Sequence, residues 1–274
     1  MRLPKLKTII LAPIALFSFV YILGALVFLF TKPEQVPDSV VLEAPLEIAI
    51  FGASGTAGDG ILKAALASND INKIHVITRR VTDRIQAGID NGKVQIIMHN
   101  DYLNYADIIS KLSTVDSVFW AIGITSLGTD EKTYGMIHVD FPLSFLQALK
   151  KVNSKTDLSF HFISSSDISE DSSTMWVREK IRAEKTLFKF AENSNLRVIA
   201  YRPDYIGPTK EEAKLGQNLL YWFFKPVGAA VKAREIGQAM IDIASRGNLI
   251  KHGTKLSTRK IIQYSDIYMN QNIK

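Results

Sequence analysis

The sequence predicts an α/β domain with a doubly wound parallel sheet, preceded by one N-terminal transmembrane helix. A glycine-rich turn at Ile48–Gly58 separates an apolar strand from a helix-compatible segment, and strand-like and helix-like segments then alternate along the chain. Such alternation is typical of a parallel sheet with right-handed crossovers. A long uncharged run precedes the domain. We therefore divide the 274 residues into a membrane anchor (1–30), a linker (31–45) and one domain (46–274).

The anchor is predicted from length and composition. Thr8–Phe30 contains no charged residue, and about 23 residues rising about 1.5 Å each span about 34 Å, enough for a hydrocarbon core of about 30 Å. A secretory signal peptide, the alternative, has a shorter apolar region, and no small-x-small cleavage site precedes Lys32. A soluble core helix would accommodate Pro13 and Gly24 poorly, whereas membrane helices tolerate both. We expect a single-pass protein whose Thr8–Phe30 segment has the bilayer as its partner.

Composition excludes several classes of function. The chain has no cysteine, which rules out disulfides and thiolate catalysis, and its five histidines show no metal-ligand spacing, so no metal site is expected. The net charge of +6 is dispersed, without a basic stripe interleaved with aromatic residues, so no nucleic-acid partner is expected. Basic residues near the C-terminus are expected to form a solvated face: Arg246, Lys251, Lys255, Arg259 and Lys260.

The segments after the glycine-rich turn follow the patterns of strands and helices. Strands are expected at Lys73–Thr78, Val94–Met98, Ser117–Ile122, Leu158–Ser164 and Arg197–Tyr201. Helices are expected at Asp59–Leu66, Tyr102–Leu112, Pro142–Val152 and Met175–Glu192.

The glycine-rich turn has the strand–turn–helix context of a dinucleotide-binding fingerprint. Gly52 would permit the tight turn, Gly55 would allow backbone to approach a pyrophosphate, and Gly58 would let the helix pack on the strand. Ser54 and Thr56 lie in the same turn and are assigned to the same phosphate site. The G-x-x-G-x-x-G spacing differs from G-x-G-x-x-G, so an ordinary glycine-rich turn is the alternative.

Two arginines at the end of the second strand select the cofactor. At this place an acidic residue binds the ribose 2′-hydroxyl of NAD, whereas arginine accommodates the 2′-phosphate of NADP. The sequence has Arg79 and Arg80 there, which favours NADP over NAD, the alternative being a solvated pair at the start of a loop.

Other candidates follow the third and fourth strands, because open α/β sheets bind ligands at the carboxyl ends of their strands. Asp101 and Tyr102 would flank an adenine, and Ala121, Ile122 and Gly123 would let backbone lie against the cofactor. A helix N-cap at Asp101 and an ordinary turn at Gly123 are the alternatives.

Several of these segments together resemble a known family, the atypical short-chain dehydrogenases/reductases, nearest to the Tat-interacting-protein and NmrA-like branch. The resemblance covers Leu46 to Arg246 and rests on Gly52–Gly58, Arg79, Ala121–Gly123, His138-Val139-Asp140, Ser164-Ser165-Ser166, Lys180 and Arg202-Pro203. It implies a Rossmann-like fold, NADP as cofactor, and hydride transfer with a serine, a tyrosine and a lysine in Tyr-x-x-x-Lys spacing.

The sequence departs from that pattern at one position. The resemblance makes Ser164 and Lys180 the catalytic candidates, with Lys180 also binding the cofactor's ribose, but Trp176 occupies the tyrosine position. An indole N–H donates a hydrogen bond but does not ionise at any useful pH, so Trp176 cannot be the general acid. Simple packing of Trp176 and exposure of Lys180 on one helix are the alternative.

Two classes of function therefore follow. The first is a membrane-anchored NADP(H)-dependent reductase of a hydrophobic or lipid-like carbonyl, with a degenerate Tyr-x-x-x-Lys site. The second is an NADPH-binding protein without turnover, active in assembly or redox sensing. The apolar cluster Leu219–Val227 is expected to be a core helix, with a substrate-pocket cap or a bilayer contact as alternatives.

The orientation in the membrane is subject to two opposed arguments. Arg2, Lys5 and Lys7 precede the apolar run and Lys32 follows it, so the positive-inside rule sends the domain across the membrane. NADPH is abundant in the cytosol, which favours a domain on the cytosolic face, and we adopt that expectation.

Overall fold

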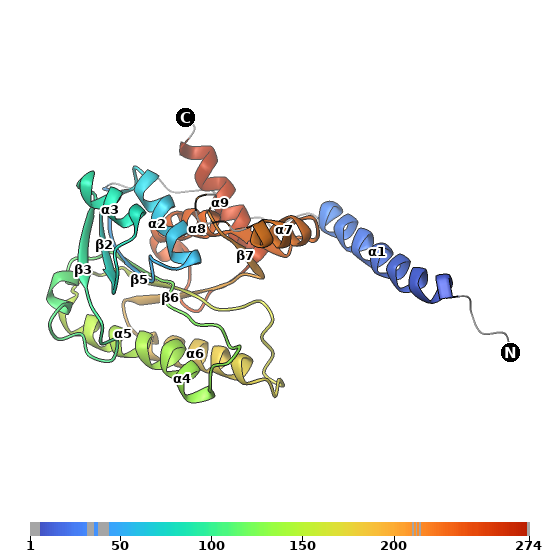
Figure 1. Cartoon of the computed structure of the whole chain (residues 1–274). Coiled ribbons are helices and arrows are strands. Elements are labelled where there is room, and N and C mark those ends of the chain that lie inside the picture. Colours follow the sequence, from blue (N-terminus) through green and yellow to red (C-terminus); the bar gives the residue numbers. More distant parts are fainter. Residues whose placement is uncertain are drawn as a thin grey trace.

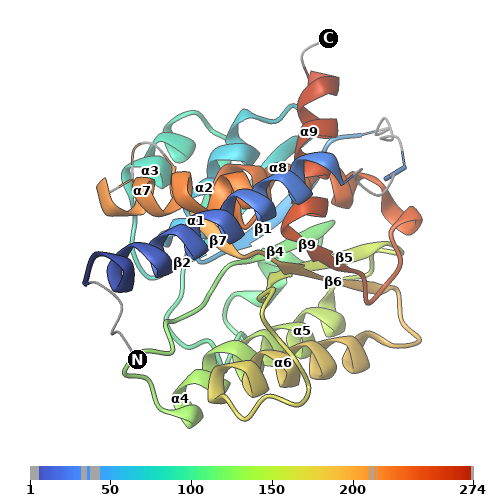
Figure 2. The same ribbon diagram turned by 90° about the vertical axis from the view of Figure 1, so that its right-hand side faces the viewer.

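The computed structural model describes residues 6–31, 36–37, 44–209, 211, 213 and 215–272. Most of the predicted linker and the flanking Arg2, Lys5 and Lys32 lie outside these residues. The described chain forms one α/β domain from which a long N-terminal helix projects (Figures 1 and 2).

A seven-stranded parallel sheet forms the centre of the domain, in the order β3-β2-β1-β4-β5-β6-β9. Its strands are β1 (Leu46–Phe51), β2 (Ile71–Thr78), β3 (Val94–Met98), β4 (Ser117–Trp120), β5 (Leu158–Ile163), β6 (Leu196–Arg202) and β9 (Lys255–Ser257). A separate parallel pair consists of β7 (Tyr205–Gly207) and β8 (Ala230–Lys232). The chain order reverses between β1 and β4, which makes this sheet a doubly wound, Rossmann-like sheet with its switch point there.

Helices cover both faces of the sheet (Figure 1). The described α-helices are α1 (Leu6–Phe30), α2 (Thr56–Ala67), α3 (Asp83–Asp90), α4 (Glu131–Gly135), α5 (Phe141–Val152), α6 (Met175–Ala191), α7 (Leu215–Phe224), α8 (Ala233–Ser245) and α9 (Thr258–Asn272). Short 3₁₀ turns occur at Ile109–Leu112, Lys225–Val227 and Gly247–Leu249, and a π-helical turn, Met136–Asp140, joins α4 to α5.

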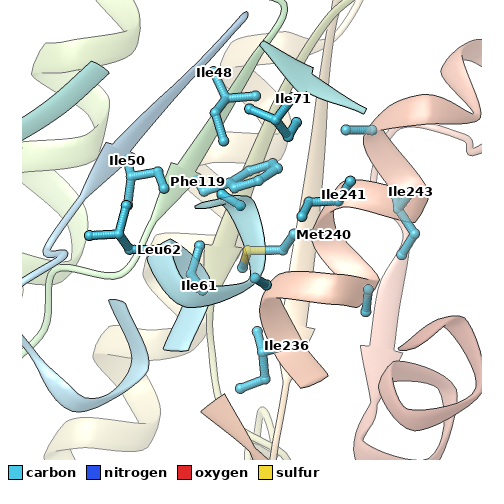
Figure 3. Packing of buried hydrophobic residues seen from close by; sticks show 14 of the residues in the cluster. Ile48, Ile50, Ile61, Leu62, Ile71, Phe119, Ile236, Met240, Ile241 and Ile243 are labelled. Carbon is cyan, nitrogen blue, oxygen red and sulfur yellow. The ribbon is translucent and has the colours of Figure 1, made fainter. Parts of the chain in front are cut away.

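Strand β1 has a hydrophobic layer on each side. Ile48 and Ile50 belong to the cluster formed with α2, α8 and α9 (Figure 3), whereas Ala49 and Phe51 belong to the cluster on the α5 and α6 side. All four side chains are fully buried. This two-sided burial explains why the strand has a continuous apolar sequence rather than an alternating one.

The predicted strands are confirmed with small shifts at their ends, but two helix predictions need correction. Helix α2 begins at Thr56 rather than Asp59, within the glycine-rich turn. The expected helix over Tyr102–Leu112 is wrong, since only its last residues form a 3₁₀ turn. Asp101 Oδ1 accepts from the Leu103 amide, and Asn104 Oδ1 from the Ala106 amide, at 3.1 Å each. These side-chain turns compete with helical hydrogen bonding.

Two expectations for the C-terminal half are also wrong. Arg246 is buried rather than solvated, because its Nε donates to Asp242 Oδ2 at 2.6 Å within α8. The Leu219–Val227 cluster is not a core helix: in α7 Leu219 is 72% exposed and Trp222 67% exposed, while Tyr221 alone among the residues of α7 is buried.

The N-terminal helix is long and apolar enough to cross a membrane. Within α1, Pro13–Phe30 has a mean hydropathy of 2.4, and none of this stretch is buried inside the protein. This ability is a matter of length and composition, which a signal sequence near the N-terminus shares.

The close approach of α2 and α8 gives a stability test at Gly60. A Cβ at Gly60 would lie 2.3 Å from the Ala233 carbonyl carbon at the start of α8. Overpacking of this kind costs about 1–3 kcal/mol, so Gly60→Ala should lower the free energy of unfolding by that amount in urea titrations. The control is Gly216→Ala in α7, where a Cβ meets nothing within 4 Å and stability should be unchanged or higher. Equal stability of Gly60→Ala and wild type would contradict this packing.

Candidate nucleotide-binding and catalytic groove

Two adjoining cavities lie at the carboxyl ends of the central strands. Their volumes are about 740 Å³ and 380 Å³, and they share Gly55 and the Ala121–Ile124 segment that follows β4. The larger cavity extends to the end of β2, and the smaller one to the end of β5 and the start of α6. Together they form one groove at the switch point of the sheet, where α/β proteins of this topology bind ligands.

The three glycines of the turn have different structural roles. Gly52 has a φ of +79°, and a Cβ there would lie 2.7 Å from the Ala121 carbonyl carbon. A Cβ at Gly58 would lie 2.0 Å from the Gly52 carbonyl oxygen. At Gly55 the nearest atom to such a Cβ is 3.5 Å away, an ordinary contact, and Gly55 lines both cavities. Protein packing therefore requires the first and third glycines, while the second leaves the groove open.

The N-terminus of α2 faces this groove. Gly55 is the N-cap, and no side chain caps the helix there. Ser54 lines the larger cavity and Thr56 the smaller one, whereas Gly58 does not line either. Uncapped amides at a helix N-terminus favour an anion, through both hydrogen bonds and the helix dipole.

The two arginines after β2 differ in their contacts. Both line the larger cavity and both are exposed. The Arg80 guanidinium donates to the Ser54 carbonyl oxygen at 3.0 Å, which links the end of β2 to the glycine-rich turn. Arg79 lies close enough to Tyr102 for its charge to lower that phenol's pKa, against the larger effect of burial, which raises it. Arg79 is thus placed at the cavity wall, within electrostatic reach of Tyr102.

The two candidates after β3, Asp101 and Tyr102, have different places in the structure. Tyr102 is buried, lines the larger cavity and stacks on Phe141 with ring centroids 5.5 Å apart. Asp101 is exposed, is absent from the described lining, and has a carboxylate that caps the turn described above. The N-cap alternative for Asp101 is wrong, since the next helical element is the 3₁₀ turn Ile109–Leu112, whose N-cap is Ile108.

Lys180 lies in the smaller cavity with Ser164 and Trp176. Its Nζ donates to the Ile163 carbonyl oxygen at 3.2 Å, at the end of β5. Burial lowers the pKa of Lys180 to about 8, although the negative charge of Glu184 acts in the opposite direction. Its ammonium group therefore titrates near neutral pH.

Ser164 is committed to a buried carboxylate. Its hydroxyl donates to Glu184 Oε1 at 2.6 Å, and the Arg202 Nε donates to the same oxygen at 2.8 Å. Lys255 Nζ lies 3.6 Å from the other carboxylate oxygen. Because a hydroxyl has one proton, Ser164 in this arrangement can accept a hydrogen bond from a ligand but cannot donate one. Ser165, the next residue, also lines the smaller cavity.

Tyr134 and His138 also line the smaller cavity. Their rings stack at 4.0 Å, and the His138 Nδ1 lies 3.1 Å from the Tyr134 carbonyl oxygen. A carbonyl can only accept, so Nδ1 carries the hydrogen and Nε2 of the neutral ring is an acceptor. Burial, aided by the charge of Lys180, lowers the pKa of His138 to about 3. Burial and the charge of Glu179 raise the pKa of Tyr134 to about 12.

The sequence analysis missed Tyr134, Glu184 and the role of His138. Glu184 follows Lys180 by four residues on α6, and this i,i+4 spacing was a usable signal for a pair on one helix face. Tyr134 had no such signal: it lies in the short helix α4, and the π-helical turn that follows carries His138. Such turns occur often at functional sites.

Two curated proteins are similar to this chain at low identity, and no family model matches it. "Protein fmp52, mitochondrial" of Emericella nidulans is 25% identical over 195 residues, covering 70% of this chain and 80% of the relative. "Protein FMP52, mitochondrial" of Candida albicans is 23% identical over 217 residues, covering 72% and 87%.

Solved structures share the fold. The Bacillus cereus UDP-glucuronic acid 4-epimerase in complex with NAD has a TM-score of 0.59 at 18% identity, covering 77% of this chain and 78% of its own. An oxidoreductase of the short-chain dehydrogenase/reductase family from Burkholderia thailandensis has a TM-score of 0.59 at 16% identity, covering 84% and 97%. The Cj0485 dehydrogenase has a TM-score of 0.61 at 15% identity, covering 81% and 96%. The predicted resemblance is confirmed for the fold, while the NmrA-like branch stays a prediction: this chain has the Rossmann-like fold of short-chain dehydrogenases/reductases and nucleotide-sugar epimerases.

Proposed function

We propose that this protein is a membrane-anchored, NADP(H)-dependent oxidoreductase that reduces a hydrophobic carbonyl substrate. The observation that carries the proposal is the groove around Gly55, where the protein's own packing leaves room for a side chain but glycine keeps the space open. Backbone exposed in this way, beside an uncapped helix N-terminus, suits a pyrophosphate.

The residues of the groove fit a dinucleotide. Amides of the Ser54–Thr56 turn and the first turn of α2 would bind its phosphates, and the Arg79 guanidinium would bind a 2′-phosphate. Lys180, at the far end of the groove, would bind the ribose hydroxyls beside the nicotinamide. The cofactor, when bound, supplies or accepts the hydride.

The proton for carbonyl reduction has to come from another group than the usual tyrosine. Among three ionisable groups of the smaller cavity, the pKa of Lys180 is about 8, that of Tyr134 about 12 and that of His138 about 3. General acids work best when their pKa is close to the working pH. Lys180, directly or through a water molecule, is therefore the best donor of the three.

The substrate class and location are inferred from the surroundings. Ile124, Ile163 and Trp176 give the smaller cavity an apolar wall, and α1 would hold the groove close to a bilayer. A cytosol-facing domain would have access to NADPH. The names of both curated relatives include "mitochondrial", and we extend that compartment to this protein as part of the proposal.

A second function, NADPH binding without turnover, is favoured by two observations. Trp176 lines the cavity where a tyrosine would supply the proton, and Ser164 donates its own proton to Glu184. Bound NADPH would then stabilise a domain that serves in assembly or redox sensing.

Nucleotide binding tests what both functions share. Gly55 has an extended backbone (φ −100°, ψ 166°), which valine adopts readily, so Gly55→Val should fold and fill the groove. We expect NADPH titration by fluorescence to show binding by the wild type and none by Gly55→Val. Arg79→Ala should weaken NADPH binding about 10- to 100-fold, because a hydrogen bond to a charged group contributes about 1.5–3 kcal/mol. NADH binding should stay nearly unchanged, since NADH has no 2′-phosphate. Equal losses for both nucleotides would show that Arg79 does not bind the 2′-phosphate, and no binding by the wild type would remove the cofactor from the proposal.

Restoring the phenol separates the two functions. Trp176→Tyr supplies an ionisable group four residues before Lys180, and general acid catalysis is worth about 10²–10⁴ in rate. We expect faster NADPH oxidation with a panel of aromatic and aliphatic carbonyls, with Trp176→Phe as the matched control that adds no acid. Wild-type and Trp176→Tyr proteins that both bind NADPH without oxidising it would support the non-catalytic function.

The pKa of Lys180 predicts the pH dependence of any turnover. The ammonium form predominates below about pH 8 and is lost above it, so NADPH oxidation should be highest near pH 6–7 and fall as the pH rises through 8. The guanidinium of Lys180→Arg keeps its charge to much higher pH than the lysine does. This variant should therefore retain NADPH binding up to pH 10, while binding by the wild type declines. A wild-type profile that is flat from pH 6 to 10 would contradict a role for the Lys180 charge.

A further inference from the structure

Helix α7 presents an apolar face that the domain does not cover. Leu215 is 92% exposed, Leu219 72% and Trp222 67%. Their i, i+4, i+7 spacing places them on one side of the helix. Tyr221 lies on the other side, packed on Gly207 of β7. The sequence of α7, Leu-Gly-Gln-Asn-Leu-Leu-Tyr-Trp-Phe-Phe, contains no charged residue.

This helix packs against the middle of α1. The Tyr21 hydroxyl donates to the Phe223 carbonyl oxygen at 2.6 Å, and the Phe223 ring stacks on Tyr21 at 5.2 Å and on Phe17 at 6.2 Å. At about 1.5 Å per residue, Tyr21 and Phe17 lie about 14 and 20 Å from the C-terminal end of α1 at Phe30. If α1 crosses a bilayer, these contacts place Phe223 at the depth of the hydrocarbon. In Figures 1 and 2 α7 lies on the side of the domain from which α1 projects.

Two cations lie beside aromatic rings of α7 and α1. Lys225 follows α7, and its Nζ lies 5.7 Å from the centre of the Trp222 ring. The Arg259 guanidinium lies 5.1 Å from the centre of the Phe28 ring, close to the end of α1. Lysine, arginine and tryptophan at the end of a membrane helix favour the headgroup region, where the cations reach phosphate.

An apolar cleft of about 520 Å³ separates α1 from the end of α7. Leu26, Phe28, Leu29, Trp222 and Pro226 line it, and Lys225 is the cation in its wall. This chemistry suits a phospholipid, with an acyl chain along the apolar side chains and a phosphate near the ammonium group.

We propose that α7 is a second membrane-docking helix, which inserts its Leu215–Leu219–Trp222 face into the bilayer beside α1 and seats a phospholipid in the cleft between them. The inference rests on the membrane anchor in the proposed function and extends it, because the domain would be held at the membrane by two helices and so oriented. Neither the nucleotide nor any turnover is needed for it.

The absence of cysteine from the sequence makes labelling at single positions possible. The full chain is placed in lipid nanodiscs, which leave both membrane faces open to reagents, and is labelled with a water-soluble maleimide at Leu219→Cys. The matched control is Leu103→Cys, also exposed, five residues after the end of β3. Strand β3 lies on the side of the domain away from α1 (Figure 1). We expect labelling at 219 to be at least about tenfold slower than at 103, with both complete after denaturation. Leu16→Cys in α1 should be protected as well.

Lipid contact is measured separately with discs made from brominated phosphatidylcholine. Wild-type fluorescence should be quenched, and Trp222→Phe should lose most of that quenching, since Trp120 is buried in the domain core and Trp176 lines the groove. Labelling at 219 as fast as at 103 would overturn the docking of α7. Slow labelling without bromolipid quenching would show that a second copy or another protein covers the helix, and overturns it too.

Failure of the two proposals can be told apart in the same discs. Fast labelling of Leu16→Cys overturns the anchor and the docking together. Protected 219 and 16 positions in a protein that does not bind NADPH would leave the docking standing and remove the nucleotide function.

Discussion

The contact between the glycine-rich turn and the end of β4 fixes the centre of this protein. Gly52 turns back at φ +79°, and its Cα lies so near Ala121 that a side chain there would overlap backbone. Gly58 then brings α2 against the carbonyl of the same Gly52. These two approaches determine where the N-terminus of α2 points and how wide the groove is. The candidate nucleotide groove and the position of α8 on α2 depend on this geometry.

The smaller cavity is built around a balance of charges rather than around one catalytic group. Glu184, buried at 2% exposure, is held by Ser164, Arg202 and Lys255. Burial lowers the pKa of Lys180, and the negative charge of Glu184 partly offsets that effect. Burial, aided by the charge of Lys180, lowers the pKa of His138. A hydroxyl that donates to a carboxylate, a lysine near its pKa and a tryptophan in the tyrosine position make this site chemically unlike the tyrosine-based site implied by the resemblance.

Helices α1 and α7 both expose apolar side chains. A domain with this sheet and its two covering helix layers needs no additional helix to bury its core, yet α7 directs leucines and a tryptophan outward. Aromatic contacts of Phe223 with Phe17 and Tyr21 join α7 to α1, while Tyr221 and Phe224 pack on the small β7–β8 pair. Under the proposed docking, the bilayer would be the solvent for both helices, and the orientation of the groove toward it would follow from their joint placement.

The local sequence was sufficient for the parallel sheet, the glycine-rich turn and the apolar α1. These features depend on continuous apolar strands, on glycines whose backbone freedom is needed where they stand, and on an uncharged run of membrane length. Local patterns also placed Arg79, Lys180 and Trp176 at the ends of elements, where the structure brings them to one groove.

Tertiary structure decided the properties that depend on distant neighbours. Asp101 and Asn104 formed turns where periodicity favoured a helix, and Arg246 was buried because Asp242 lies one turn before it in a helix covered by α2 and α9. The proton of Ser164 is held by Glu184, 20 residues away, the pKa of Lys180 is set first by its burial, and Tyr134 of α4 lines the same cavity as Lys180 of α6. Burial, charge and hydrogen bonding act through space. A sequence pattern can therefore place a side chain on an element, but it cannot determine the protonation state or the solvent exposure of that side chain.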